Sequence, residues 1–310
     1  MRISIFSLLY CISFIGISFA NSSNKNWEIT HRLIKEANAI DRQWLDKATG
    51  KGMNDSAKSE SRRAWEKVKA HLESLSLDEL IETASSAAEH VAHRTELTDD
   101  WEREAAATSD VEFILSLFYL KNPEPSDIDA LLLRIRNDQE SAYFRVALFS
   151  WFRNQVIQER LPAIGSNHVK NAVIQVSYDI LSNAQPPETV WGAALNAYCD
   201  IIIYDILSIC KTNEALRPYL RDPEAKPQLF EHLRNGKIAV PDEVKTQLTD
   251  RNKDLSRLTE ILGKNLTNDQ SPCIKSTIIY VLRKLSAIPV GTTEQRELER
   301  LQSEFSMKEQ

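Results

Sequence analysis

The residues whose types could do chemistry lie in one stretch, EHVAHRTELTDDWE, at positions 89–102. His90 and His93 are three residues apart, so on a helix their side chains share one face and could bind one metal ion. Glu96 comes three residues later still and, at about 100° per residue, points away from His90. Completing the ligand shell would fall to the carboxylates that follow: Asp99, Asp100 and Glu102.

A solvated helix end is the other interpretation of this stretch. The zinc-binding helix pattern H-E-x-x-H is absent from the sequence. Histidine and acidic residues are also common at helix ends, where they are hydrated and interact with exposed backbone groups. The remaining histidines stand apart from one another and are interpreted as surface or capping residues: His31, His71, His168 and His232.

Other catalytic patterns are missing from the chain. There is no G-x-S-x-G elbow and no cysteine in a glycine-rich neighbourhood. Acid pairs such as Asp127 with Asp129 occur at helix starts, where they satisfy exposed amide groups. We therefore expect a binding or scaffold protein with no catalytic residue and no cofactor. The alternative is a metal-dependent hydrolase that uses His90, His93 and the nearby acids.

Composition predicts an all-α protein. Of 310 residues, 42% are hydrophobic and 26% charged, but only 8 are glycine and 11 proline, too few for many tight hairpins. Apolar residues recur at intervals of three and four, which is typical of amphipathic helices. The net charge of −6 gives no electrostatic reason to bind nucleic acid.

The first twenty residues resemble a secretory signal peptide. Arg2 precedes an apolar stretch, and Ser18 and Ala20 stand at the small-residue positions before a cleavage site. We expect residues 1–20 to be removed and the protein to be periplasmic or extracellular; the alternative is an uncleaved membrane anchor. After cleavage we expect no membrane span, because the other long apolar run contains Asp200 and Asp205.

Proline residues mark a predicted boundary. Pro123 and Pro125 restrict the residues before them and each lacks a backbone donor. They divide the chain into an N-terminal helical region, 21–122, and a C-terminal helical-repeat-like region, 123–310. Helix starts are indicated by two S-x-x-E/D patterns: Ser76 with Glu79, and Ser126 with Asp129.

Three cysteines follow the signal segment. Cys199 and Cys210 fall on one predicted helix, eleven residues and about 16 Å apart, too far for a disulfide. Buried free thiols are the simplest interpretation. If one disulfide forms, we expect it between Cys210 and Cys273.

Paired helices over residues 126–286 resemble HEAT-type helical repeats. Aromatic residues take similar places in the segments RVALFSWF, IQVSYDIL, LNAYCDII and TIIYVLRKL: Phe149, Tyr178, Tyr198 and Tyr280. The resemblance implies a curved α-solenoid whose concave groove binds a protein or peptide. An irregular helical bundle has the same apolar spacing and stays open as the alternative.

Overall fold

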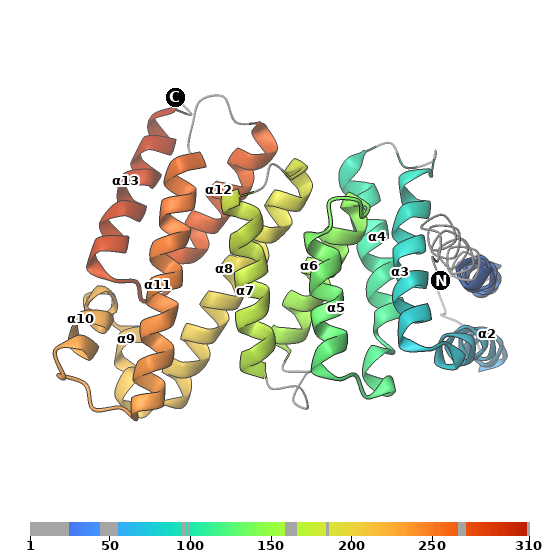
Figure 1. Ribbon diagram of the computed structural model, residues 1–310, viewed down its shortest axis with the longest axis horizontal. Coiled ribbons are helices and arrows are strands. Elements are labelled where there is room, and N and C mark those ends of the chain that lie inside the picture. The colour runs from blue at the N-terminus through green and yellow to red at the C-terminus, as the bar shows by residue number, and fades with distance from the viewer. Residues whose placement is uncertain are drawn as a thin grey trace, which may run out of the picture. The chain divides into compact units, whose positions relative to one another are not determined.

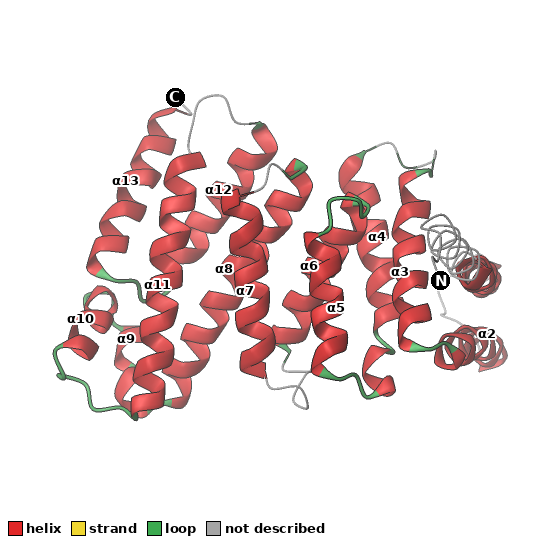
Figure 2. Cartoon of the chain, viewed as in Figure 1, coloured by secondary structure: helices red, strands yellow, loops and turns green. Residues whose placement is uncertain are grey.

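The computed structural model describes residues 25–43, 55–94, 97, 99–158, 166–183, 186–265 and 271–308. All regular elements in these ranges are helices, and no strand occurs among them (Figure 2). The predicted all-α class of packed helix pairs is therefore confirmed. The predicted signal peptide, residues 1–20, lies outside the described residues.

Helices follow one another with short connections (Figure 1). The first covers residues 25–43. The later ones are α2 (Asp55–Ser74), α3 (Leu77–Ala92), α4 (Asp100–Leu115), α5 (Pro125–Arg136), α6 (Ala142–Ile157), α7 (Ser166–Asn183), α8 (Glu188–Thr212), α9 (Pro218–Arg221), α10 (Leu229–Arg234), α11 (Asp242–Asn265), α12 (Pro272–Leu285) and α13 (Thr292–Lys308). Single 3₁₀ turns stand between some of them: η1 (Phe118–Lys121), η3 (Glu214–Leu216) and η4 (Lys226–Gln228).

Capping chemistry sets several helix starts. The predicted capping box at α3 is confirmed, with Ser76 and Glu79 bonded to each other's backbone amides. At α5 the predicted Ser126 start is wrong, because Glu124 is the cap and forms the box with Asp127. Pro125 explains the shift, since its fixed φ suits the first helical position and its missing N–H costs nothing there.

The chain forms two compact units, Met1–Leu148 and Phe149–Gln310. The division falls inside α6, after the proline-rich stretch at which the sequence places the boundary. Each unit is described below by itself.

In the first unit, α3 and α4 pack extensively against each other. Helix 25–43 is attached beside them by polar contacts near both of its ends. The Asn26 amide donates to the Glu79 carboxylate of α3 over 3.4 Å. The Trp65 indole of α2 donates to the Asp41 carboxylate over 3.0 Å. These contacts hold helix 25–43 against α3 at one end and against α2 at the other.

In the second unit, α8 is the central helix and packs against α7, α11 and α12 (Figure 1). In the described part of the chain, α8 is the one helix long and apolar enough to cross a membrane, and 61% of that stretch is buried inside the protein. Such burial is expected of a helix that packs against neighbours on more than one side. Its carboxylate Asp205 is buried in an ion-pair network rather than exposed.

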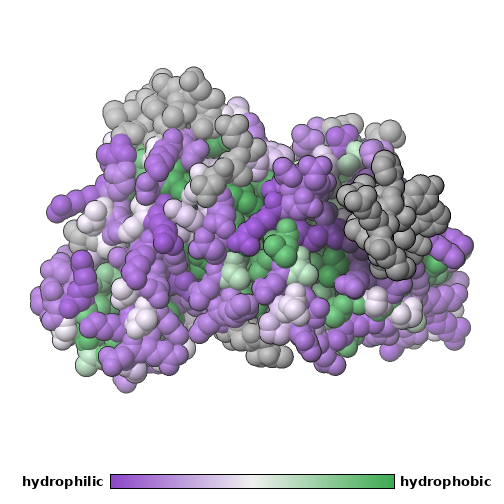
Figure 3. All heavy atoms as spheres, viewed as in Figure 1, coloured by the Kyte–Doolittle hydropathy of each residue, from purple (hydrophilic) through white to green (hydrophobic). Residues whose placement is uncertain are grey.

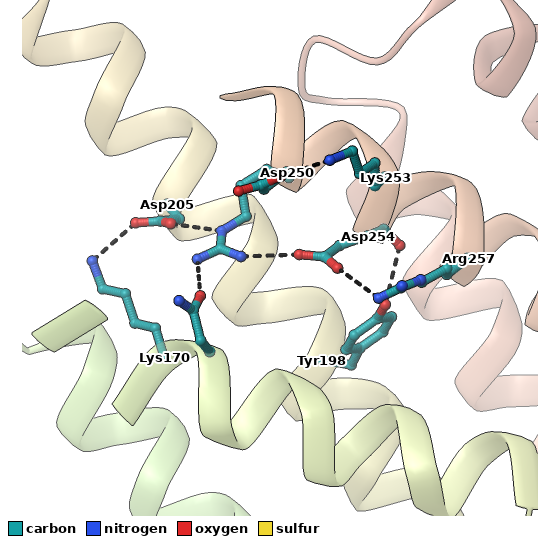
Figure 4. Close-up of polar contacts among 9 residues, drawn as sticks. Lys170, Tyr198, Asp205, Asp250, Lys253, Asp254 and Arg257 are labelled. Carbon is teal, nitrogen blue, oxygen red and sulfur yellow. Dashed lines mark hydrogen bonds and ion pairs between the residues drawn. The ribbon is translucent and has the colours of Figure 1, made fainter. Parts of the chain in front are cut away.

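That network joins three helices (Figure 4). Asp205 of α8 accepts from Lys170 of α7 over 2.9 Å and from the Arg251 guanidinium of α11 over 2.7 Å. Arg251 also donates to Asp254 over 2.9 Å and to Asn171 over 2.7 Å. Each charged group thus has partners inside the protein, as burial of charge requires.

The three cysteines are free, so the disulfide expected between Cys210 and Cys273 does not form. The reason is the direction of α12, which runs parallel to α8: Ser271 bonds to Glu188 over 2.7 Å, and Lys284 to Asp200 over 2.5 Å. Cys273 therefore lies beside the start of α8. Cys210 stands at the other end, about 33 Å from Glu188 at 1.5 Å per residue.

The four aromatic residues that carry the HEAT resemblance differ in environment. Phe149 and Tyr198 are fully buried, Tyr178 is half-buried, and Tyr280 is 50% exposed. Membership in that repeat family stays a prediction. On the face drawn in Figure 3, hydrophilic side chains predominate and hydrophobic areas are small and separate.

Candidate functional site

The two predicted metal ligands have different surroundings. His90 lies in the last turn of α3 and is half-buried, whereas His93 is the C-cap residue and its side chain is exposed. Glu96 lies outside the described residues. Among the residues that the structure describes, no three His, Cys, Asp or Glu side chains are placed to hold a metal ion. The metal pair therefore stays a prediction.

His90 instead belongs to a cluster of three rings, Trp27, His31 and His90. Trp27 and His31 stack with their centroids 5.1 Å apart and their planes at 14°. The His90 ring is tilted against both, at 4.5 Å from His31 and 5.7 Å from Trp27. The cluster joins helix 25–43 to α3. His31, interpreted from the sequence as an isolated surface or capping residue, is half-buried, and its ring packs against those of Trp27 and His90.

The three rings line a pocket of about 700 Å³ in the first unit. Helix 25–43 supplies most of its lining, the last turn of α3 adds His90, the chain just after α3 adds Arg94, and α4 adds Asp110. The volume falls within the range of about 300–1,000 Å³ typical of small-molecule sites. Apolar surface comes from Ile34 and Ala39, and amide groups from Asn38 and Gln43.

Charge is distributed unevenly around this pocket. Three cationic side chains line it, Lys35, Arg42 and Arg94, while Asp110 is the one carboxylate among the described lining residues. Burial raises the pKa of the Asp110 carboxyl to about 6, against the opposing effect of the Arg94 charge. The pocket therefore becomes more positive as the pH falls through about 6.

The pKa of His31 is lowered, in part by the same positive surroundings. Burial lowers it most, and the nearby positive charges of His90, Lys35 and Arg94 lower it further. A lowered pKa keeps the His31 ring neutral at physiological pH. In this state the ring offers one donor and one acceptor nitrogen beside the cationic side chains.

A second hollow of about 380 Å³ lies between α2 and α4 of the same unit. Its floor is formed by the rings of Trp65 and Phe113, which meet edge to face at 5.6 Å. Its rim carries both signs of charge, from Arg62, Lys69 and Glu66. With two cations, one carboxylate and no histidine or amide side chain in its described lining, it offers fewer groups for recognition than the first pocket.

The sequence contained one signal for the larger pocket. Trp27, His31, Lys35, Ala39 and Arg42 follow each other at intervals of three and four, so they form one stripe on a helix. The stripe mixes rings with cations. Apart from Trp27, these residues are separate from those that the helix buries, Thr30 and Ala37, so the sequence indicates a polar face that carries rings.

Comparison with known proteins identifies no relative. No protein-family model, no curated protein and no solved structure matches the chain. The fold and the pocket therefore define the protein only as an all-α protein with a ring-lined, cation-rich pocket in its first unit. Any function has to be argued from that site.

Proposed function

We propose that the protein binds a small molecule in the pocket lined by helix 25–43, α3 and α4. The observation that carries this proposal is the convergence of three rings and three cations on one cavity of ligand size. Aromatic walls with a few convergent polar groups are the usual lining of ligand sites.

Binding is favoured over catalysis by the groups at hand. No hydroxyl or thiol side chain is among the described residues that line the pocket, so the described lining supplies no serine, threonine, tyrosine or cysteine nucleophile. Two thiols of the second unit are poorly suited to the role, since burial raises the pKa of Cys210 to about 12 and that of Cys199 still further. The predicted hydrolase gains no support from this lining.

Two earlier expectations stay predictions beside this proposal. A protein or peptide partner is implied by the repeat resemblance, and the pocket supports a smaller ligand. Export rests on residues 1–20, which are outside the described residues.

Filling the pocket should abolish binding. Ala39 is an exposed residue of the lining, so Ala39→Phe adds a ring to the cavity without disturbing the core. Titration of the uncharged fluorescent probe N-phenyl-1-naphthylamine should show saturable binding of about one equivalent to the wild type. We expect at least a roughly tenfold weaker affinity for Ala39→Phe, since about 1.4 kcal/mol of lost contact suffices.

The matched control is Ala105→Phe, at an exposed position of α4 that does not line the pocket. This variant should bind the probe like the wild type, and both variants should keep the wild-type circular dichroism spectrum. Unchanged affinity in Ala39→Phe, or no saturable binding by the wild type, would contradict the proposal.

A further inference from the structure

We propose that the natural ligand is an anion, a carboxylate, phosphate or sulfonate group attached to an aromatic or alkyl body. Lys35, Arg42 and Arg94 would hold the charged group, and the ring wall would contact the body. This inference rests on the proposed function and adds the chemical class of the ligand.

The charge that lines the pocket is opposite in sign to the net charge of the chain. The whole chain carries a net charge of −6, yet three cations and one carboxylate line this cavity. Concentrating positive charge in a concave site of an acidic protein raises the local concentration of anions. A cationic ligand would meet repulsion there, and a divalent metal ion would find only one carboxylate among the described lining residues.

The three cations of the pocket come from two separate parts of the chain. Lys35 and Arg42 are exposed residues seven positions apart on helix 25–43, so they lie on one face two turns apart. Arg94 comes from the chain just after α3. Charges that converge from two elements can surround one anionic group, which a single row of surface lysines cannot do. Guanidinium groups also match carboxylate and phosphate oxygens in pairs.

The cluster of Trp27, His31 and His90 lies beside those charges in the pocket lining. Trp27 is 5% exposed, and its stacking on His31 holds both rings in place. A rigid ring surface favours a ligand with a flat or alkyl body, because little side-chain freedom is lost on binding. The neutral His31 ring adds a hydrogen-bonding group between the rings and the cations of the pocket.

A pair of matched probes tests this inference. The probe 8-anilinonaphthalene-1-sulfonate is N-phenyl-1-naphthylamine with one sulfonate group added. We expect the wild type to bind the sulfonate about tenfold or more tightly than the neutral probe, since hydrogen bonds to charged groups contribute that much. Added salt should weaken the binding of the sulfonate probe only, because salt screens its charge.

Substitutions then locate the effect. Lys35→Gln and Arg42→Gln should each weaken sulfonate binding about five- to tenfold and change binding of the neutral probe less than about twofold. Asp110→Asn removes the opposing carboxylate and should tighten sulfonate binding about fivefold at pH 8. Arg63→Gln, at an exposed position of α2 outside the lining, is the control and should change neither.

The outcomes separate the two proposals. If the wild type bound both probes with equal affinity, or if the lysine and arginine variants bound both probes equally more weakly, the proposal of an anionic ligand would be overturned. The proposal of a binding site would stand. Saturable binding of neither probe would overturn the proposed function itself. Selective loss of sulfonate binding with retained binding of the neutral probe supports both.

Discussion

Replacing Asp205 with alanine is expected to destabilise the protein by about 3–5 kcal/mol. The substitution leaves Lys170 and Arg251 buried without the carboxylate that both contact. Both cations and Asp205 itself have side chains less than 10% exposed, so water cannot replace the lost partner. Urea denaturation followed by circular dichroism measures the change.

A nearby exposed pair provides the matched control. Asp250 pairs with Lys253 over 2.9 Å, and their side chains are 54% and 66% exposed (Figure 4). Asp250→Ala should therefore cost less than about 1 kcal/mol, as exposed pairs usually do. A similar loss of stability in both variants would show that burial does not set the cost.

A second variant tests what the network contributes. Replacing Lys170, Asp205, Arg251 and Asp254 together by Met, Leu, Met and Asn removes every buried charge of the network, including the carboxylate that Arg251 also contacts. Because desolvation of buried ions offsets much of their attraction, we expect the quadruple variant to be more stable than Asp205→Ala by at least about 2 kcal/mol. A quadruple variant less stable than the single one would show that the ion pairs themselves stabilise the fold.

Tyr198→Ala is expected to cost about 3–5 kcal/mol, by removing a fully buried ring from the centre of α8. Tyr198→Phe keeps the ring and loses only the hydroxyl, which donates to the Asp254 carbonyl over 3.2 Å. That variant should cost about 1 kcal/mol. Tyr280→Ala is the control at a 50% exposed position and should cost less than about 1 kcal/mol. The same denaturation experiment compares all three.

Equal costs for Tyr198→Ala and Tyr280→Ala would contradict the packing described here. A cost for Tyr198→Phe that equals that of Tyr198→Ala would instead assign the whole effect to the hydrogen bond. The expected order separates the contribution of the ring from that of the hydroxyl.

Local features of the fold could be predicted from the sequence because their causes are local. The Ser76–Glu79 box depends on residues three apart, and the apolar intervals of α8 are visible within its own 25 residues. The sequence predicts the cap of α5 at Ser126, two residues after the observed cap Glu124, because two capping patterns overlap there. Pro125 favours the earlier pattern, since its fixed φ suits the first helical position.

The partners of buried charges could not be predicted, because they depend on how distant helices pack. Asp205 was visible as an acid on an apolar helix. Its partners Lys170 and Arg251 are 35 and 46 residues away, and no local pattern connects them. The pocket is similar, since His31 and His90 meet only when helix 25–43 packs against α3.

The position of the bound ligand is the central claim, and ring-proton NMR of the histidines tests it most directly. His31 and His90 line the pocket, whereas His168 and His232 belong to the second unit and serve as internal controls. On addition of 8-anilinonaphthalene-1-sulfonate, we predict that the signals absent from His31→Gln and His90→Gln shift, and that the pKa of His31 rises towards its ordinary value. Shifts confined to His168 or His232, or unchanged His31 and His90 signals at saturation, would contradict the account.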